Sequence, residues 1–174
     1  MIGPLELAAA LLLGAAGVAK LITPGPAVLM LRRAWRPMPH VVVRIAAAVE
    51  VAVALTALAL GDRWSALGLG ACYLAFAVVS ARLLQRREHA SCGCFGRADS
   101  PVGGVHLVLN AAAAGIAAAA ALRPPGRFDG LLDGTLLHGV VGAGQSALLA
   151  YLGFLSITAL PTLTAARRHL LEAR

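Results

Sequence analysis

Charged residues are scarce in this sequence, and aromatic residues are scarcer still. Only 13% of the 174 residues are charged and 5% are aromatic, whereas 59% are hydrophobic. A soluble globular domain carries about 25% charged and roughly 45–50% apolar residues. The chain therefore has too little polar surface to cover a water-soluble globule, and its composition excludes an ordinary soluble domain.

The net charge of +7 does not indicate nucleic-acid binding. A nucleic-acid-binding surface gathers its basic residues on one face or along one helix. Here they lie between apolar runs, and only two Trp and two Tyr accompany them. Arginines facing anionic lipid headgroups explain the same charge, so we expect a lipid bilayer and no nucleic acid as a partner.

No basic residue precedes the first apolar run, which follows "MIGPLE". The first region of a secretory signal peptide is positively charged. We therefore expect the first helix to remain in the mature protein.

Five apolar runs have the length of about 20 residues that a helix needs to cross a bilayer. Alanine and glycine dominate them, as in "AAAAGIAAAA", and such small residues let membrane helices pack closely. The predicted fold is all-α, a polytopic membrane bundle. It has a four-helix core in residues 1–122, an interfacial loop in residues 123–142, and a fifth helix with a basic tail in residues 143–174. The five spans are expected at about residues 4–22, 41–60, 64–84, 102–122 and 144–163.

The basic residues are distributed unevenly between the two ends of these spans. The first loop, the third loop and the C-terminal tail, with the adjoining helix ends, hold twelve of the 15 Lys and Arg residues. Cytoplasmic loops of membrane proteins carry an excess of Lys and Arg. The distribution predicts a multi-pass protein of the inner (plasma) membrane with its N-terminus outside and its C-terminus in the cytoplasm.

The chain has only three cysteines, and two of them lie one residue apart in "SCGCFG". Gly93 gives the backbone the freedom to close a small disulfide ring between Cys92 and Cys94. Such a ring is strained and therefore easily reduced, and nearby arginines such as Arg97 favour the reactive thiolate. We predict that Cys92 and Cys94 carry thiol–disulfide redox chemistry.

Two other interpretations of this pair stay open. His89 with Cys92 and Cys94 could bind zinc or cuprous copper, completed by Asp99 or His106. The two cysteines could also be reduced bystanders. The third cysteine, Cys72, lies in the third run, roughly 20 Å from the loop at about 1.5 Å per helical residue, and is interpreted as a buried apolar residue.

Three polar residues inside the apolar runs fall in the same half of the bilayer. An acidic residue at the bilayer centre costs about 2.5–3.5 kcal/mol, so Glu50 should face the bundle and bond to Lys20 or Asn110. Two roles remain open for Glu50. It could form hydrogen bonds between helices. It could instead relay protons, or bind a quinone-like electron acceptor, near the cysteines. Lys20 and Arg44 are expected to snorkel to the membrane interface.

Four segments resemble the methylamine-utilisation MauE branch of the DoxX-like membrane proteins, over roughly residues 5–122. They are "GVAKL", "RIAAAVEVAVAL", "SCGCFGRADSPV" and "HLVLN". The resemblance implies a small helical bundle in thiol redox traffic, with a thioredoxin-like partner and a client protein, as in maturation of methylamine dehydrogenase. Nothing in the chain points to methylamine itself. The site residues that the resemblance carries over are Lys20, Glu50, Cys92, Cys94, Phe95, Gly96 and Asn110.

Relatives often carry an arginine directly before the asparagine, where this chain has Leu109. His106 or Arg97 would then have to take the place of that arginine. Three function hypotheses follow from the residues and the resemblance together. They are a membrane thiol–disulfide oxidoreductase or electron conduit, a metal-binding or metal-transporting membrane protein, and a non-catalytic membrane scaffold.

Overall fold

The computed structural model describes residues 3–35, 37–86, 102–122 and 136–159, and these residues form helices and short connections without a strand. Five of the helices are long and apolar enough to cross a membrane. This confirms the predicted all-α membrane bundle with four spans before residue 123 and a fifth after it. The helices are α1 (Gly3–Ile22), α2 (Gly25–Ala34), α3 (His40–Leu60), α4 (Arg63–Gln85), α5 (Gly104–Ala121) and α7 (Leu136–Thr158).

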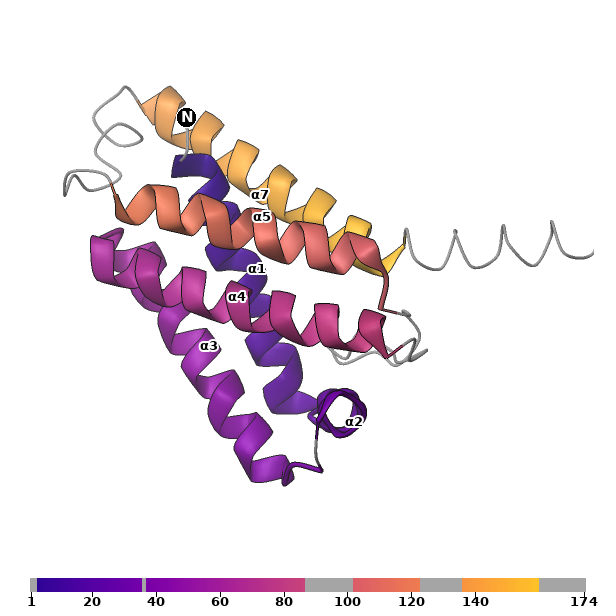
Figure 1. Ribbon diagram of the computed structural model, residues 1–174. Coiled ribbons are helices and arrows are strands. Elements are labelled where there is room, and N and C mark those ends of the chain that lie inside the picture. The colour runs from indigo at the N-terminus through magenta and orange to yellow at the C-terminus, as the bar shows by residue number, and fades with distance from the viewer. Residues whose placement is uncertain (1–2, 36, 87–101, 123–135, 160–174) are drawn as a thin grey trace, which may run out of the picture.

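Each of the five long helices runs opposite to the one before it in the sequence (Figure 1). Every second connection therefore lies at the same end of the bundle. One end holds the start of α1, the turn between α3 and α4, the end of α5 and the start of α7. Helix α1 contacts each of the other four spans. It is also the most enclosed, with 44% of its membrane window buried against 11% for α7. The remaining surface is rich in exposed Leu, Val and Ile, as expected where lipid surrounds a bundle.

Small residues set the distance between α1 and α3. A Cβ atom on Gly17 would lie 2.8 Å from Val51 Cγ2 and 3.0 Å from the Ala47 carbonyl oxygen. No side chain fits there without moving backbone, so glycine allows the two helices to touch. The predicted packing through small residues is thus present at the α1–α3 contact.

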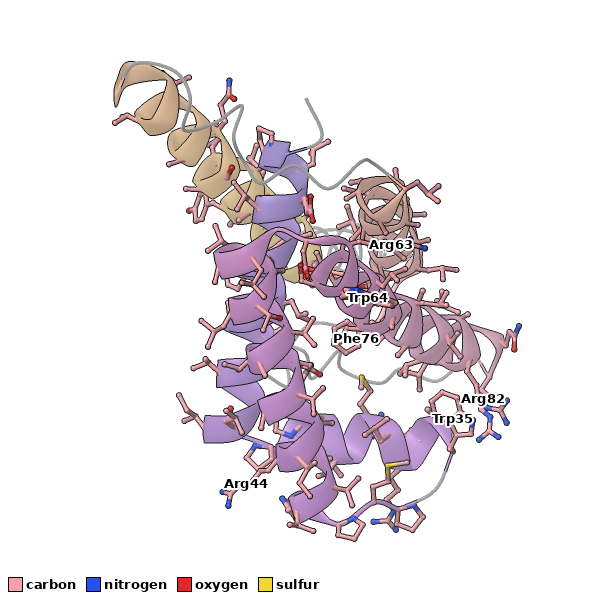
Figure 2. The ribbon with its side chains drawn as sticks, turned by 90° about the vertical axis from the view of Figure 1, so that its left-hand side faces the viewer. Trp35, Arg44, Arg63, Trp64, Phe76 and Arg82 are labelled. Carbon is pink, nitrogen blue, oxygen red and sulfur yellow. The ribbon has the colours of Figure 1, made fainter. Side chains whose placement is uncertain are left out.

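The structure has a helix, α2, where the sequence predicts only a connection between two spans. This helix begins at a Gly-Pro pair, and proline near a helix start is favourable because its φ angle is already helical. Figure 1 shows α2 end-on and Figure 2 shows it lengthwise, so it lies across the end of the bundle. Its Ala27 and Met30 are buried while Arg32 and Arg33 are exposed, as in an amphipathic helix at a membrane interface. Its ten residues are too few for a span, and for that reason a search for long apolar runs misses it.

A tight reversal joins α3 to α4 at the opposite end. Gly61 ends α3 with φ of 57°, a left-handed conformation that favours glycine. Asp62 then caps α4, because its Oδ1 accepts a hydrogen bond of 2.9 Å from the Ser65 backbone N–H. That hydrogen bond stabilises the carboxylate and lowers the pKa of Asp62. Two residues therefore suffice to turn the chain back into the bundle.

The fifth span begins earlier than predicted. Helix α7 starts at Leu136 rather than at about Gly144, so residues 136–142 are helical, whereas the sequence had assigned them to a loop. The rest of that loop, 123–135, and the tail, 160–174, lie outside the described residues. Helix α7 packs on α1, where a Cβ on Gly153 would lie 2.9 Å from Leu12 Cδ1. Gly153 therefore permits close packing of α7 on α1.

Candidate functional site

A buried ion pair joins α1 to α3. Lys20 is the only lysine in the sequence, and its Nζ donates to both carboxylate oxygens of Glu50, at 2.7 and 2.6 Å. Only 5% of the Lys20 side chain and 8% of the Glu50 side chain are exposed. Side chains on a helix lean toward its N-terminus, so Lys20, near the end of α1, reaches back into the bundle. Glu50 therefore bonds to Lys20, one of its two expected partners, and the expectation that Lys20 snorkels to the interface is wrong. Arg44, in contrast, is exposed.

Two aromatic rings of α4 extend this polar centre. The ammonium of Lys20 lies 4.2 Å from the centroid of the Phe76 ring, within the range of a cation–π interaction. Figure 2 shows Phe76 pointing from α4 toward the bundle. Phe76 packs edge-to-face on Tyr73 at 6.1 Å between ring centroids, and the Tyr73 hydroxyl donates to the Ala9 carbonyl at 2.7 Å. Neither ring was predicted from the sequence as part of the site, although two aromatics three residues apart are conspicuous in so alanine-rich a chain.

A cavity of about 170 Å³ lies between α1, α4, α5 and α7. Its wall is nearly all apolar, and the polar groups in it come chiefly from His106 and Asn110. These two residues are one helical turn apart on α5, so they share a face, and their exposed fractions are 1% and 7%. Tyr73 and Phe76 also line the cavity. Phe76 thus contacts both the cavity and the Lys20–Glu50 pair, and the two features form one connected centre.

The imidazole of His106 is held from one side only. The Gly103 backbone N–H donates to His106 Nδ1 at 3.1 Å, where Gly103 caps the start of α5. The other ring nitrogen, Nε2, is buried and has no hydrogen-bond partner among the residues that the structure describes. A buried ring nitrogen without a partner is unusual, because buried polar groups are nearly always hydrogen-bonded.

Six predicted site residues fall in the connection between α4 and α5, outside the described part of the chain. The redox pair and its metal-binding alternative therefore remain predictions. Within the described ranges, no three His, Cys, Asp or Glu side chains form a metal site. Cys72 has a free thiol and packs partly buried against the core, apart from this connection in the sequence. The six residues are His89, Cys92, Cys94, Phe95, Gly96 and Arg97.

The two described ends of that connection contact α2 or the cluster that α2 forms with α4. At the α4 end, the Arg86 guanidinium donates to the Arg33 carbonyl at 3.3 Å. One turn earlier, Arg82 Nε donates to the Ala34 carbonyl at 3.2 Å. At the α5 end, Val102 packs on the buried cluster that α2 and α4 form.

These arginines also complete α2 itself. Their positive charge satisfies carbonyl groups at the C-terminus of that helix, where cations are favoured. Figure 2 shows Arg82 beside Trp35, with the guanidinium 5.3 Å from the ring centroid. Helix α2 is thus held by hydrogen bonds, apolar packing and a cation–π contact.

The helices and the buried pair together define a multi-pass membrane protein built around a charged centre. Residues 2–123 match the model of the family described as methylamine utilisation protein MauE. This match covers well over half of the chain, so the protein belongs to the MauE family, as its sequence segments had suggested. No curated protein and no solved structure matches the chain.

Proposed function

We propose that the protein is a thiol–disulfide redox protein of the membrane, in which Cys92 and Cys94 alternate between a dithiol and a disulfide. One structural observation carries the proposal. The chain before the cysteine segment is hydrogen-bonded to α2 through Arg86, and the chain after it packs through Val102 on the cluster that α2 and α4 form. A segment whose two ends are held at the same end of the bundle suits a pair of cysteines that must meet repeatedly. Membership of the MauE family supports the same assignment.

The reaction proposed is exchange with a thioredoxin-like partner that serves a client protein. One cysteine thiolate attacks the disulfide of the partner and forms a mixed disulfide. The thiolate of the other cysteine then attacks that bond, so that a Cys92–Cys94 disulfide forms and the partner leaves as a dithiol. Two electrons pass to the partner, and the reverse sequence returns them. Positive charge near a cysteine favours the thiolate, and the sequence places Arg86, Arg87 and Arg97 within six residues of the pair.

The orientation proposed follows the arginine count, with the N-terminus outside and the C-terminus in the cytoplasm. Helix α2, the end of α4 and the start of α5 then lie at the cytoplasmic face of the inner membrane. The exposed Arg32 and Arg33 of α2 support this placement, because anionic lipids attract basic residues at that surface.

The test replaces each cysteine with serine, singly and together, with Cys72→Ser as the matched control. Intact mass and thiol alkylation are compared after oxidation and after mild reduction. We expect wild type and Cys72→Ser to lose two hydrogens on oxidation and regain them on reduction. The single variant that lacks the resolving cysteine should instead trap a mixed disulfide with the partner, and the variant that lacks the attacking cysteine should form none.

Three results would contradict the redox proposal, and each would favour a different alternative. Absence of the bond even after oxidant treatment would leave the cysteines as bystanders. Tightly bound zinc or copper with thiols that resist alkylation would favour a metal site at His89, Cys92 and Cys94. Unchanged client maturation in the double variant would favour a membrane scaffold.

A further inference from the structure

We infer that helix α2 is a binding site for an anionic phospholipid, with the Arg32 guanidinium on the lipid phosphate and Leu29 against the acyl chains. Three observations carry this site. They are the unequal charge at the two ends of the bundle, the mixed basic and apolar outer face of α2, and the contacts that fix α2 to the bundle.

Charge is distributed unevenly between the two ends of the bundle. Five of the six arginines in the described residues lie at the end that α2 crosses, where Lys20 already neutralises Glu50. The opposite end has Arg63 together with two acids, Glu6 and Asp62. Each Lys or Arg close to an anionic membrane surface strengthens attachment by a factor of about five, so an anionic lipid gains at the α2 end only. The five are Arg32, Arg33, Arg44, Arg82 and Arg86.

The outer face of α2 combines a basic and an apolar side chain. Ala27, Met30 and Ala34 form the buried inner face. Leu29 and Arg32 lie one turn apart on the opposite face, and Leu29 is 54% exposed. Such a helix lies at the boundary between headgroups and acyl chains. A phospholipid offers a phosphate to Arg32 and a hydrocarbon chain to Leu29, whereas an acidic protein surface would leave Leu29 against polar groups.

Helix α4 fixes α2 to the bundle. Arg82 and Arg86 of α4 donate hydrogen bonds of 3.2 and 3.3 Å to the carbonyl groups of Ala34 and Arg33. The Arg82 guanidinium also lies 5.3 Å from the centroid of the Trp35 ring, beside it in Figure 2. The lipid site is thus built on a helix that the fold already holds in place, so binding does not have to order the helix first.

The two tryptophans of the chain report on the two ends of the bundle separately. Trp35 directly follows α2 and is 38% exposed. Trp64 lies in the first turn of α4, at the opposite end, and is 74% exposed. Replacing Trp64 with Phe therefore leaves a single reporter beside the lipid site, and replacing Trp35 with Phe leaves a single reporter far from it.

The binding experiment uses the full chain in nanodiscs of phosphatidylcholine with a minority of phosphatidylglycerol. One of the two lipids is brominated in its acyl chains near the headgroup, so that it quenches tryptophan fluorescence on contact. Per lipid, phosphatidylglycerol should quench Trp35 several-fold more strongly than phosphatidylcholine, and Trp64 no more strongly. Raising the salt concentration from about 0.1 to 1 M shortens the Debye length from about 10 to 3 Å and should remove most of this preference.

Lipid binding does not depend on the proposed thiol chemistry. The Cys92→Ser/Cys94→Ser variant should therefore show the same preference for phosphatidylglycerol at Trp35. The lipid site can hold where the redox proposal fails, and the reverse is equally true.

Matched arginine variants in the Trp64→Phe background test the site itself. Arg32→Gln should lower the preference for phosphatidylglycerol at Trp35 about two- to fivefold, and Arg32→Lys, which keeps the charge, should retain it. Arg63→Gln, the same change on an exposed arginine at the opposite end, should leave the quenching of Trp35 unchanged.

Two results would overturn the lipid site. Equal quenching of Trp35 by the two lipids, or an equal effect of Arg32→Gln and Arg63→Gln, would leave the outer face of α2 to an acidic protein partner. Loss of the preference in inorganic phosphate, compared with chloride at the same ionic strength, would show that Arg32 takes free phosphate and not a lipid.

Discussion

The buried pair of Lys20 and Glu50 predicts a strong dependence of stability on keeping both charges. Replacing Lys20 with Met removes the ammonium and leaves the Glu50 carboxylate, 8% exposed, without a counter-charge. Breaking a buried ion pair by removing one partner costs about 3–5 kcal/mol. Lys20→Met also removes the contact with Phe76, whereas Glu50→Gln preserves it and keeps an oxygen that can accept from Lys20. We therefore expect Lys20→Met to be the more destabilising of the two.

The double variant, Lys20→Met with Glu50→Gln, separates the interaction energy of the ion pair from the contacts that each residue makes with its other neighbours. With Met and Gln together no charge is buried, and replacement of a whole buried pair is often neutral or stabilising. If each single substitution costs about 3–5 kcal/mol and the double variant is close to wild type, the coupling energy equals the sum of the two single costs, about 6–10 kcal/mol. Reversible unfolding in mixed micelles, followed by circular dichroism, measures all four proteins under one condition. Single substitutions within about 0.5 kcal/mol of wild type, or a double variant equal to the sum, would refute the reasoning.

Two further predictions concern helix packing and orientation. Gly17→Ala should destabilise the bundle by about 1–3 kcal/mol through overpacking against Val51, whereas Gly25→Ala, where an added Cβ meets nothing, should not, as thermal unfolding will show. Thiol labelling of sealed vesicles with a membrane-impermeant maleimide should modify reduced Cys92 and Cys94 from the cytoplasmic face only. Labelling from the outer face would reverse the proposed orientation.

The spans could be predicted from the sequence because hydropathy is a local property. A run of about 20 apolar residues identifies a span without knowledge of its neighbours, and four of the five were located to within a few residues. Helix α2 and the start of α7 could not be found in this way. The first is short and held by Arg82 and Arg86 from another helix, and the second lies in a glycine-rich stretch, which has a low helix propensity.

The sequence predicted the polar residues of this centre but not which of them bond to one another. The cost of a buried acid implied that Glu50 has a partner, and the choice between Lys20 and Asn110 depended on how α1, α3 and α5 pack. The same packing decides that Lys20 points inward rather than to the interface. Phe76 and Tyr73 went unrecognised because aromatics in an apolar helix are ordinary until a cation or a cavity is found beside them.

The Lys20–Glu50 pair and His106 differ in whether the described fold satisfies their hydrogen bonds. Lys20 and Glu50 satisfy one another, so an ion pair that holds α1 against α3 accounts for both without a ligand. His106 is different, because Gly103 satisfies one ring nitrogen and nothing in the described chain satisfies the other. An apolar side chain at that position would fill the same space without burying an unpaired donor. Within the described residues, the packing of the bundle therefore gives no reason for a histidine there rather than an apolar side chain.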